Sequence, residues 1–165
     1  MIAQAARPTW RRVSTGFALL LLVGLSACAV QLVADYDSVA YDQAIDLAKK
    51  VDRFYGDLME VDAGSGRKYA AWSQRYVEIE TDLRSQLMRN KARPLNAEST
   101  EISQIILDKW LKYKEQHKAA NKYDDGKARL DRGRFQRLFT SAVKAESAKD
   151  LGVEDADEPA DGDGG

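Results

Sequence analysis

The fold is decided by residues 40–61, AYDQAIDLAKKVDRFYGDLMEV, in which apolar side chains return at alternating steps of four and three. The members of this stripe are Ala40, Ala44, Leu47, Val51, Phe54, Leu58 and Val61. An α-helix turns once in about 3.6 residues, so this spacing places the stripe on one face of a helix that packs in a bundle. Asp37 or Ser38 can cap the start of the helix, and the glycine-rich run at 63–66 ends it.

The same spacing returns in three further stretches. The second stripe is Tyr69, Trp72, Tyr76, Ile79, Leu83 and Leu87; the third is Ile102, Ile105, Ile106, Trp110 and Tyr113; the fourth is Leu130, Phe135, Leu138, Phe139, Ala142 and Val143. Pro94 cannot join a helix interior, so the second helix is expected to end near Asn90. Asn96 or Ser99 can cap the third helix, and residues 124–126 mark the break before the fourth.

These stripes predict an all-α protein, an antiparallel three- to four-helix bundle over residues 37–149 with up-down-up-down connections. No stretch of useful length alternates between polar and apolar residues as a strand does. Gly133 lies inside the fourth stripe and costs a helix about 1 kcal/mol relative to alanine. The prediction therefore leaves the number of helices at three or four.

Charge is unevenly distributed along the chain, although the net charge is only −1. Residues 35–62 carry eight acidic and three basic side chains, whereas residues 109–137 carry ten basic and four acidic ones. We therefore expect the acidic first helix to lie beside the basic last helix. Residues 151–165 hold six acidic residues, no Lys or Arg and few apolar side chains. Residues 150–165 are therefore predicted to be a disordered acidic tail.

The first 28 residues have the order of a secretory signal. Arg7, Arg11 and Arg12 precede the apolar run at 17–25, and LSAC, residues 25–28, closes the segment. The apolar run is nine residues long, and a helix that spans a bilayer needs about 20. The serine and alanine of the closing motif are small enough for a cleavage site, and its cysteine is the only one in the chain.

This motif, Leu25-Ser26-Ala27-Cys28, resembles the lipobox of bacterial lipoproteins. The resemblance implies a signal peptide at residues 1–27, cleavage between Ala27 and Cys28, and a diacylglyceryl thioether on Cys28. A third acyl chain, such as palmitate, is often added to the new amine. Two or more acyl chains anchor a protein stably to a membrane. By the sorting rule of enterobacterial lipoproteins, Ala29 in place of aspartate favours the outer membrane over the inner membrane.

Residues 28–36 would then be the acylated cysteine and a short tether. The eight residues after the cysteine reach at most ~28 Å when fully extended, which keeps the folded body near the bilayer. Leu32 and Val33 could instead extend the first helix backwards. Two alternatives stay open: an ordinary secreted protein with a free or buried thiol, and twin-arginine export directed by Arg11 and Arg12.

Residues that could carry chemistry are few. His117 is the only histidine, and its basic and polar neighbours predict a solvated position near a helix end. A metal or haem protein in which Met59 or Met88 joins His117 is an alternative, but isolated methionines usually fill gaps in a core. The acidic residues within 78–82 are expected on a charged surface. The sequence therefore predicts a protein that is not an enzyme and holds neither a cofactor nor a metal.

Two sets of residues are candidates for binding. The possible anionic-surface set is Lys109, Lys112, Lys118, Lys122, Lys127, Arg129, Arg132, Arg134 and Arg137; the possible ligand-pocket set is Trp72, Tyr76, Trp110 and Tyr113. Outside the cytoplasm the basic set would meet anionic lipids, polysaccharides or acidic proteins rather than nucleic acid. The simpler interpretations are a solvated basic face partly satisfied by the acidic helix, and aromatic rings that form the core.

The sequence therefore predicts a lipid-anchored, non-catalytic lipoprotein of the cell envelope, acting as an interaction or structural module on the periplasmic side of the membrane. Its expected partners are the membrane, through the acyl chains on Cys28, and an envelope protein or anionic envelope surface, with no nucleic acid. The principal alternative is a small-ligand-binding helical carrier with an aromatic pocket. The seam within residues 35–61 could also mediate self-association.

Overall fold

The computed structural model describes residues 32–157, with side chains described through residue 150. These residues form α2 (Ser38–Glu60), the 3-10 turn η1 (Ser65–Arg67), α3 (Tyr69–Ala92), α4 (Ala97–Ala120) and α5 (Asp125–Asp157). No strand occurs in this part of the chain, so the predicted all-α class is confirmed. None of the helices found between residues 32 and 157 has both the length and the apolar character needed to cross a bilayer. The predicted signal peptide and Cys28 lie outside the described residues.

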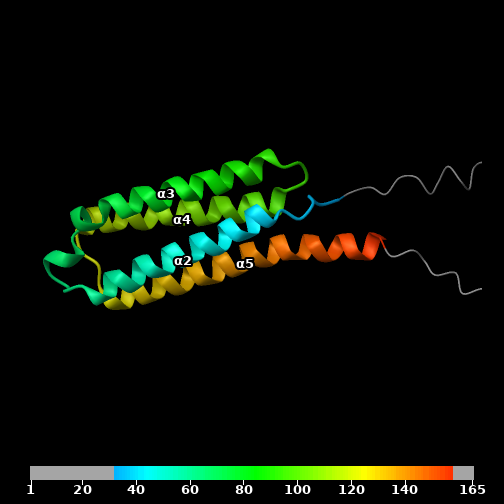
Figure 1. Cartoon of the computed structure of the whole chain (residues 1–165). Helices are drawn as coiled ribbons and strands as arrows, with labels where there is room; N and C mark the ends of the chain where they lie inside the picture. The colour runs from blue at the N-terminus through cyan, green and yellow to red at the C-terminus, as the bar shows by residue number, and fades with distance from the viewer. Residues whose placement is uncertain (1–31, 158–165) are drawn as a thin grey trace, which may run out of the picture. The chain divides into compact units, whose positions relative to one another are not determined.

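The four helices form an antiparallel bundle with up-down-up-down connections (Figure 1). Each helix packs against two neighbours: α2 and α4 both contact α3 and α5, which closes a ring in which α3 and α5 lie diagonally opposite. The acidic first helix therefore packs beside the basic last helix, as predicted. Asp52 of α2 accepts a hydrogen bond from Nε of Arg132 in α5 at 2.6 Å, an ion pair between these two helices.

Asp37 caps the start of α2, as the sequence predicts. Its Oδ1 accepts the backbone N–H groups of Val39 at 3.0 Å and Ala40 at 3.2 Å, two donors that have no partner within the helix. The alternative in which α2 extends back to residues 32–33 is wrong. The N–H of Ala34 donates instead to the carbonyl of Leu95 at 3.2 Å, which binds this segment to the turn between α3 and α4.

The other helix ends follow the predicted signals with small shifts. α3 continues to Ala92, two residues past Asn90, and stops before Pro94. Asn96 stands at the N-cap of α4, but its side-chain amide donates to the Asn90 carbonyl at 3.1 Å instead of capping the helix. Oδ1 of Asp124 accepts the N–H of Lys127 at 2.7 Å at the start of α5. Thus the third helix begins at the predicted place but without the predicted cap.

Helix α5 is continuous through Gly133 and runs to Asp157. The bundle therefore has four helices rather than three. The predicted disordered tail began at residue 150, and this boundary is too early, because residues 150–157 continue the helix. Adding residues to an existing helix avoids the cost of nucleating one, which explains how a polar segment can remain helical. Residues 158–165 lie outside the described part of the chain.

Aromatic rings fill the centre of the bundle. The Phe54 ring centroid lies 5.2 Å from that of Trp72, 4.7 Å from Tyr76 and 5.1 Å from Trp110. Most members of the predicted stripes are buried, but Ile105 and Leu130 are exposed, which corrects the third and fourth stripes. At these places the inward faces of the helices carry polar residues, which an apolar pattern cannot indicate.

Candidate functional site

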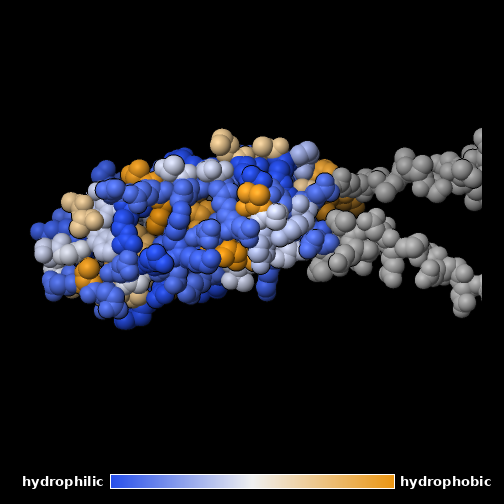
Figure 2. Space-filling view, viewed as in Figure 1, coloured by the Kyte–Doolittle hydropathy of each residue, from blue (hydrophilic) through white to orange (hydrophobic). Residues whose placement is uncertain are grey.

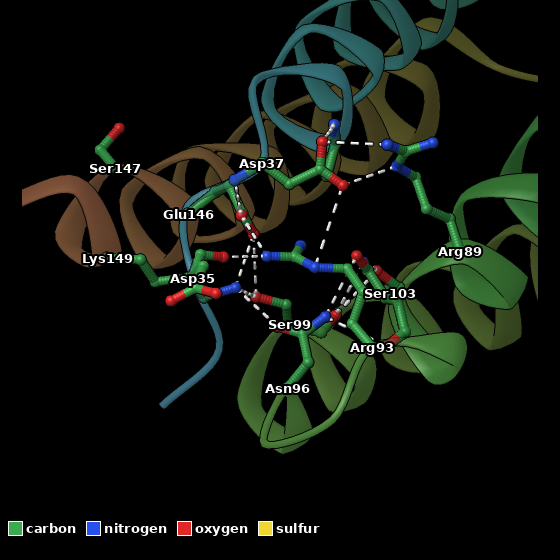
Figure 3. Close-up of polar contacts among 12 residues, drawn as sticks. Asp35, Asp37, Arg89, Arg93, Asn96, Ser99, Ser103, Glu146, Ser147 and Lys149 are labelled. Carbon is green, nitrogen blue, oxygen red and sulfur yellow. Dashed lines mark hydrogen bonds and ion pairs between the residues drawn. The ribbon is translucent and has the colours of Figure 1, made fainter. Parts of the chain in front are cut away.

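A buried polar cluster joins three parts of the chain at the end of the bundle where the described chain begins (Figure 3). We call this cluster the N-terminal clamp and define it as Asp37, Arg89, Arg93, Asn96, Ser99, Glu146 and Lys149. Its members come from the start of α2, from the end of α3 with the turn and first part of α4, and from α5. Segments separated by about 50 and by more than 100 residues therefore meet here.

Glu146 is the centre of the clamp and is only 3% exposed. Its Oε1 accepts the backbone N–H of Asp37 and an Nη2–H of Arg93, both at 2.9 Å, and its Oε2 accepts from Nζ of Lys149 at 2.6 Å. Burial raises the pKa of Glu146, but the hydrogen bonds from Arg93 and Lys149 outweigh this effect and hold the pKa below its ordinary value. The carboxylate is therefore ionised and fully engaged.

Lys149 is satisfied in the same way. Besides Glu146, its Nζ donates to Oδ1 of Asn96 at 2.6 Å and to Oγ of Ser99 at 2.8 Å. An ammonium group has three donors, and each has a partner here. Because the lysine is buried, these bonds hold α5 firmly against the start of α4.

Asp37 connects the clamp to the segment that precedes α2. Arg89 donates to both Asp37 carboxylate oxygens, from Nε at 2.8 Å and from Nη2 at 3.0 Å. These hydrogen bonds from Arg89 lower the pKa of Asp37, and those from the Ala40 backbone add to the effect. Arg93 also donates to the backbone carbonyl of Asp35. The clamp thus fastens the segment that leads into α2 to both the α3–α4 turn and α5.

A second polar network lies at the opposite end of the bundle, and His117 stands in it. His117 is 1% exposed, so the prediction of a solvated histidine is wrong. Its Nε2 lies 2.9 Å from the carbonyl oxygen of Arg67, which can only accept, so Nε2 carries the proton. Nδ1 is then the acceptor for the Tyr76 hydroxyl at 3.2 Å. Burial lowers the pKa of His117, with a further contribution from Lys127, which agrees with a neutral ring.

Arg67 connects His117 to the adjoining helix ends. Its Nε donates to the carbonyl of Val61 and its Nη2 to that of Met59, each at 2.9 Å, which satisfies acceptors at the end of α2. Nη1 forms an ion pair with Asp125 at the start of α5. Sequence reasoning missed this residue, although an arginine soon after a helix end is a known means of satisfying its last carbonyls.

Asp131 is the buried acid of this second network, with no exposed surface. It accepts from the Tyr123 hydroxyl at 2.7 Å, from Lys127 Nζ at 2.6 Å and from Arg134 Nη1 at 2.9 Å. Burial raises the pKa of Tyr123, so its phenol stays protonated and donates. We call His117, Tyr76, Arg67, Tyr123, Asp131 and their partners the distal network.

The nine basic residues predicted as a possible anionic surface lie on α4, on α5 and in the loop between them. Three of them form internal ion pairs: Lys127 and Arg134 with Asp131, and Arg132 with Asp52. Five are exposed and have no ion pair with the side chains described between residues 32 and 150: Lys112, Lys118, Lys122, Arg129 and Arg137. Lys109 lies over the Tyr113 ring, 5.6 Å from its centroid. The structure thus divides the set into structural and solvated members.

The four aromatic residues predicted as a possible ligand pocket are buried in the core. Tyr76 and Trp110 pack with ring centroids 5.0 Å apart, and the Trp110 indole donates to the Tyr76 carbonyl at 3.1 Å. Tyr113 packs edge-on against Phe135 at 5.8 Å. A surface groove of about 520 Å³ lies between α2 and α5, and its walls include Ile45, Ala48, Phe135, Phe139 and Val143 but none of these four residues. The arrangement favours the core interpretation.

Of the two methionines in the haem alternative, Met59 lies near the end of α2, at the same end of the bundle as His117, but Met88 does not. Met88 is exposed on the last part of α3, at the clamp end, whereas His117 lies in the last turn of α4 at the other end. Both ring nitrogens of His117 are engaged in hydrogen bonds. Within residues 32–157, no group of three or more His, Cys, Asp or Glu side chains is arranged to hold a metal ion.

Comparisons of the chain with protein-family profiles, with curated proteins and with solved structures each give no match.

Proposed function

We propose that this chain is a bacterial lipoprotein, anchored through acyl chains on Cys28, whose helical bundle acts as a non-catalytic interaction or structural module. We place it on the periplasmic face of the outer membrane, because Ala29 follows the cysteine. The support comes from the order of charged, apolar and small residues before Cys28. It also comes from the way in which the bundle binds the segment between Cys28 and α2.

The observation that carries the proposal is the position of Ala34. This residue is buried and hydrogen-bonded to the Leu95 carbonyl, so the packed body begins six residues after Cys28. Six extended residues reach about 20 Å, which is less than the ~28 Å predicted from the sequence for a tether that ends at residue 36. An acyl anchor on Cys28 would therefore hold the clamp end of the bundle beside the membrane.

The polar networks support a structural rather than a catalytic role for the bundle. The carboxylates of Glu146 and Asp37 are bound to cations of the same cluster, and the His117 ring is bound on both sides. These groups hold the helix ends together through their hydrogen bonds, which gives each of them a structural role. The carrier alternative gains no support, because the rings that would line its pocket pack against one another.

The test is Cys28→Ser in the full chain, expressed in a Gram-negative host. We expect the wild-type protein to sediment with membranes and the variant to move to the aqueous periplasmic fraction, since one thioether carries the anchor. Ala29→Asp is the matched variant: in an enterobacterial host it should stay acylated but shift from the outer to the inner membrane. Sedimentation of Cys28→Ser with salt-washed membranes would contradict the proposal.

The interaction part of the proposal has its own test. Lysine-directed crosslinking in intact cells can capture a partner through the exposed lysines of α4, such as Lys112 and Lys118. We expect a reproducible macromolecular adduct with the wild-type protein that weakens in Cys28→Ser, because the anchor sets its location. Reproducible absence of any adduct would count against an interaction module.

A further inference from the structure

Exposed apolar side chains gather at the clamp end of the bundle, where Figure 2 shows apolar surface. Of the eight large apolar residues that are exposed between residues 32 and 150, four lie here: Val33, Val39, Met88 and Leu95. A fifth, Leu32, comes just before Val33 in the sequence. Val39 is the second residue of α2, and Met88 lies four residues, or about 6 Å, before the end of α3. We call the four residues the apolar tip.

Leu95 is the most informative member of the tip. Its φ of 57° lies in the left-handed region, which glycine and asparagine tolerate but which strains a leucine. Its side chain is 54% exposed, so packing within the bundle does little to offset the strain. The turn is nevertheless fixed, because Asn96 beside it is buried and bonded to Asn90 and Lys149. A strained, outward-pointing leucine on a rigid turn indicates a surface that meets something else.

We infer that the apolar tip inserts into the headgroup region of a phospholipid bilayer. The inference rests on the proposed acylation of Cys28, and chain length identifies the occupant. Cys28 lies five residues before Val33, a reach of about 18 Å, so the tip is the part of the bundle that an anchored chain holds nearest to the lipid. Apolar faces of interfacial segments enter the bilayer by about 5–10 Å. The distance of about 6 Å from Met88 to the end of α3 lies within that range.

Insertion of the tip would tilt the bundle relative to the membrane. The tip residues belong to the approach to α2, to α2 and α3, and to the α3–α4 turn, whereas α5 lies diagonally opposite α3 and continues to Asp157. The last part of α5 is acidic in sequence. If the α3 side of the clamp end faces the membrane, the apolar tip enters the lipid and the acidic end of α5 stays away from anionic headgroups.

Charge plays a minor part in this contact. The arginines nearest the tip, Arg89 and Arg93, are engaged by Asp37 and Glu146 within the clamp. The exposed Lys91 donates to Oε1 of Gln104 at 3.3 Å, so it is the one nearby cation that salt could affect among residues 32–150. A contact made mainly by apolar side chains should respond little to salt, because screening acts on charges. Weak salt dependence therefore distinguishes insertion of the tip from attraction of the exposed basic residues to the same membrane.

The experiment places an environment-sensitive nitrobenzoxadiazole probe on single cysteines in the full acylated protein. The thioether of Cys28 does not react with the label, so Leu95→Cys marks the tip, Ser65→Cys marks the exposed η1 turn at the distal end, and Ala148→Cys marks the exposed face of α5 at the clamp end. The proteins are reconstituted in vesicles of phosphatidylethanolamine and phosphatidylglycerol that carry nitroxide-labelled headgroups. Circular dichroism confirms that each labelled protein is folded.

We expect the probe at position 95 to be blue-shifted and quenched several-fold more strongly than the probes at positions 65 and 148, with little change on adding salt. A water-like probe at position 95, equal quenching at all three positions, or quenching abolished by salt would overturn the inference. Mass spectrometry of the same preparation separates two failures. An unmodified Cys28 overturns the proposed function, whereas an acylated Cys28 with a water-like probe at 95 overturns this inference alone.

Discussion

The two ends of the bundle reverse the chain in different ways. At the distal end the left-handed residue is Asn121, with φ 48°, whose N–H donates to the carbonyl of His117 at 2.7 Å and whose side chain accepts the N–H of Tyr69 at 3.0 Å. At the clamp end the left-handed residue is Leu95, which is strained and exposed. The distal turn uses the residue type that its backbone favours. The clamp turn does not, which suggests that its leucine serves a contact outside the bundle.

The ends also differ in the groups that hold them together. The clamp depends mainly on ionised side chains that compensate one another around Glu146. The distal network depends in part on a neutral histidine and on tyrosine hydroxyls. A network of paired charges loses its stabilising effect when one partner is removed. A network built on a neutral histidine loses its stabilising effect when the histidine is protonated. Four changes test this difference.

Removing Glu146 should have the largest effect. Glu146→Ala leaves Lys149 as a buried cation without a carboxylate partner and removes one of the two carboxylates that pair with Arg93. We expect the free energy of unfolding to fall by about 3–5 kcal/mol. Urea unfolding followed by circular dichroism measures the change. Glu115→Ala, the same substitution at an exposed position of α4, is the control and should stay within about 0.5 kcal/mol of the wild type. Equal effects would mean that the clamp contributes no special stability.

Acidification should next separate the ends. The folded state holds the pKa of His117 below its ordinary value of 6.5, so the unfolded chain takes up this proton first. The stability that depends on neutral His117 is therefore complete above pH 6.5 and falls as the pH drops below it, by at most about 1.4 kcal/mol per pH unit. The pKa values of Glu146 and Asp37 are lowered from 4.5 and 3.8, so their contribution is lost only at more acidic pH.

His117→Gln provides the control for this pH dependence. Unfolding free energies measured between about pH 7.5 and pH 5 should decline in the wild type and decline less in the variant. Parallel declines in the two proteins would show that another group titrates in this window and that His117 is not the sensitive part of the distal network.

Loss of the tyrosine hydroxyl that His117 accepts should have a moderate effect. Tyr76→Phe leaves Nδ1 of His117 buried without a donor, and we expect a loss of about 1–2 kcal/mol in unfolding free energy. Tyr69→Phe is the matched control, since the Tyr69 ring packs against Tyr76 and His117 but its hydroxyl forms no hydrogen bond with residues 32–157. If both variants lose the same stability, the ring packing rather than the hydroxyl accounts for the effect.

Exchanging the two left-handed residues should give the smallest effects, with opposite signs. Leu95→Asn relieves backbone strain at an exposed site, and we expect it to stabilise the bundle in detergent by up to about 1 kcal/mol. Asn121→Leu introduces the same strain at the distal end and removes the bond to Tyr69, so it should destabilise. Thermal unfolding of the two variants measures both changes. A loss of stability in Leu95→Asn would show that the leucine serves the bundle itself.

The fold was predictable because its core is periodic in sequence. The stripe that contains Phe54 and the cap at Asp37 both follow from local residue spacing, and the structure contains both. The polar networks were not predictable, because the type of a charged residue does not show whether its side chain is buried or solvated. Glu146 meets the backbone of Asp37 across 109 positions in the chain, and no local pattern indicates that pair.

His117 shows the same limit most clearly. Its sequence neighbours are basic and polar, which predicted a solvated site, yet η1 and the rings of Tyr69 and Tyr123 cover it. The packing of η1 and of these two rings against the end of α4 buries the His117 ring. Residues of the clamp such as Arg93 and Lys149 escaped prediction for the same reason, since their partners are distant in sequence.

The most direct test of the whole account is the mass of the N-terminal peptide of the mature protein. After purification from membranes and digestion, mass spectrometry should find a peptide that begins at Cys28 and carries a diacylglyceryl group, with or without a third acyl chain on its amine. A peptide that begins at Cys28 with an unmodified thiol, or one that still contains residues 1–27, would contradict the account.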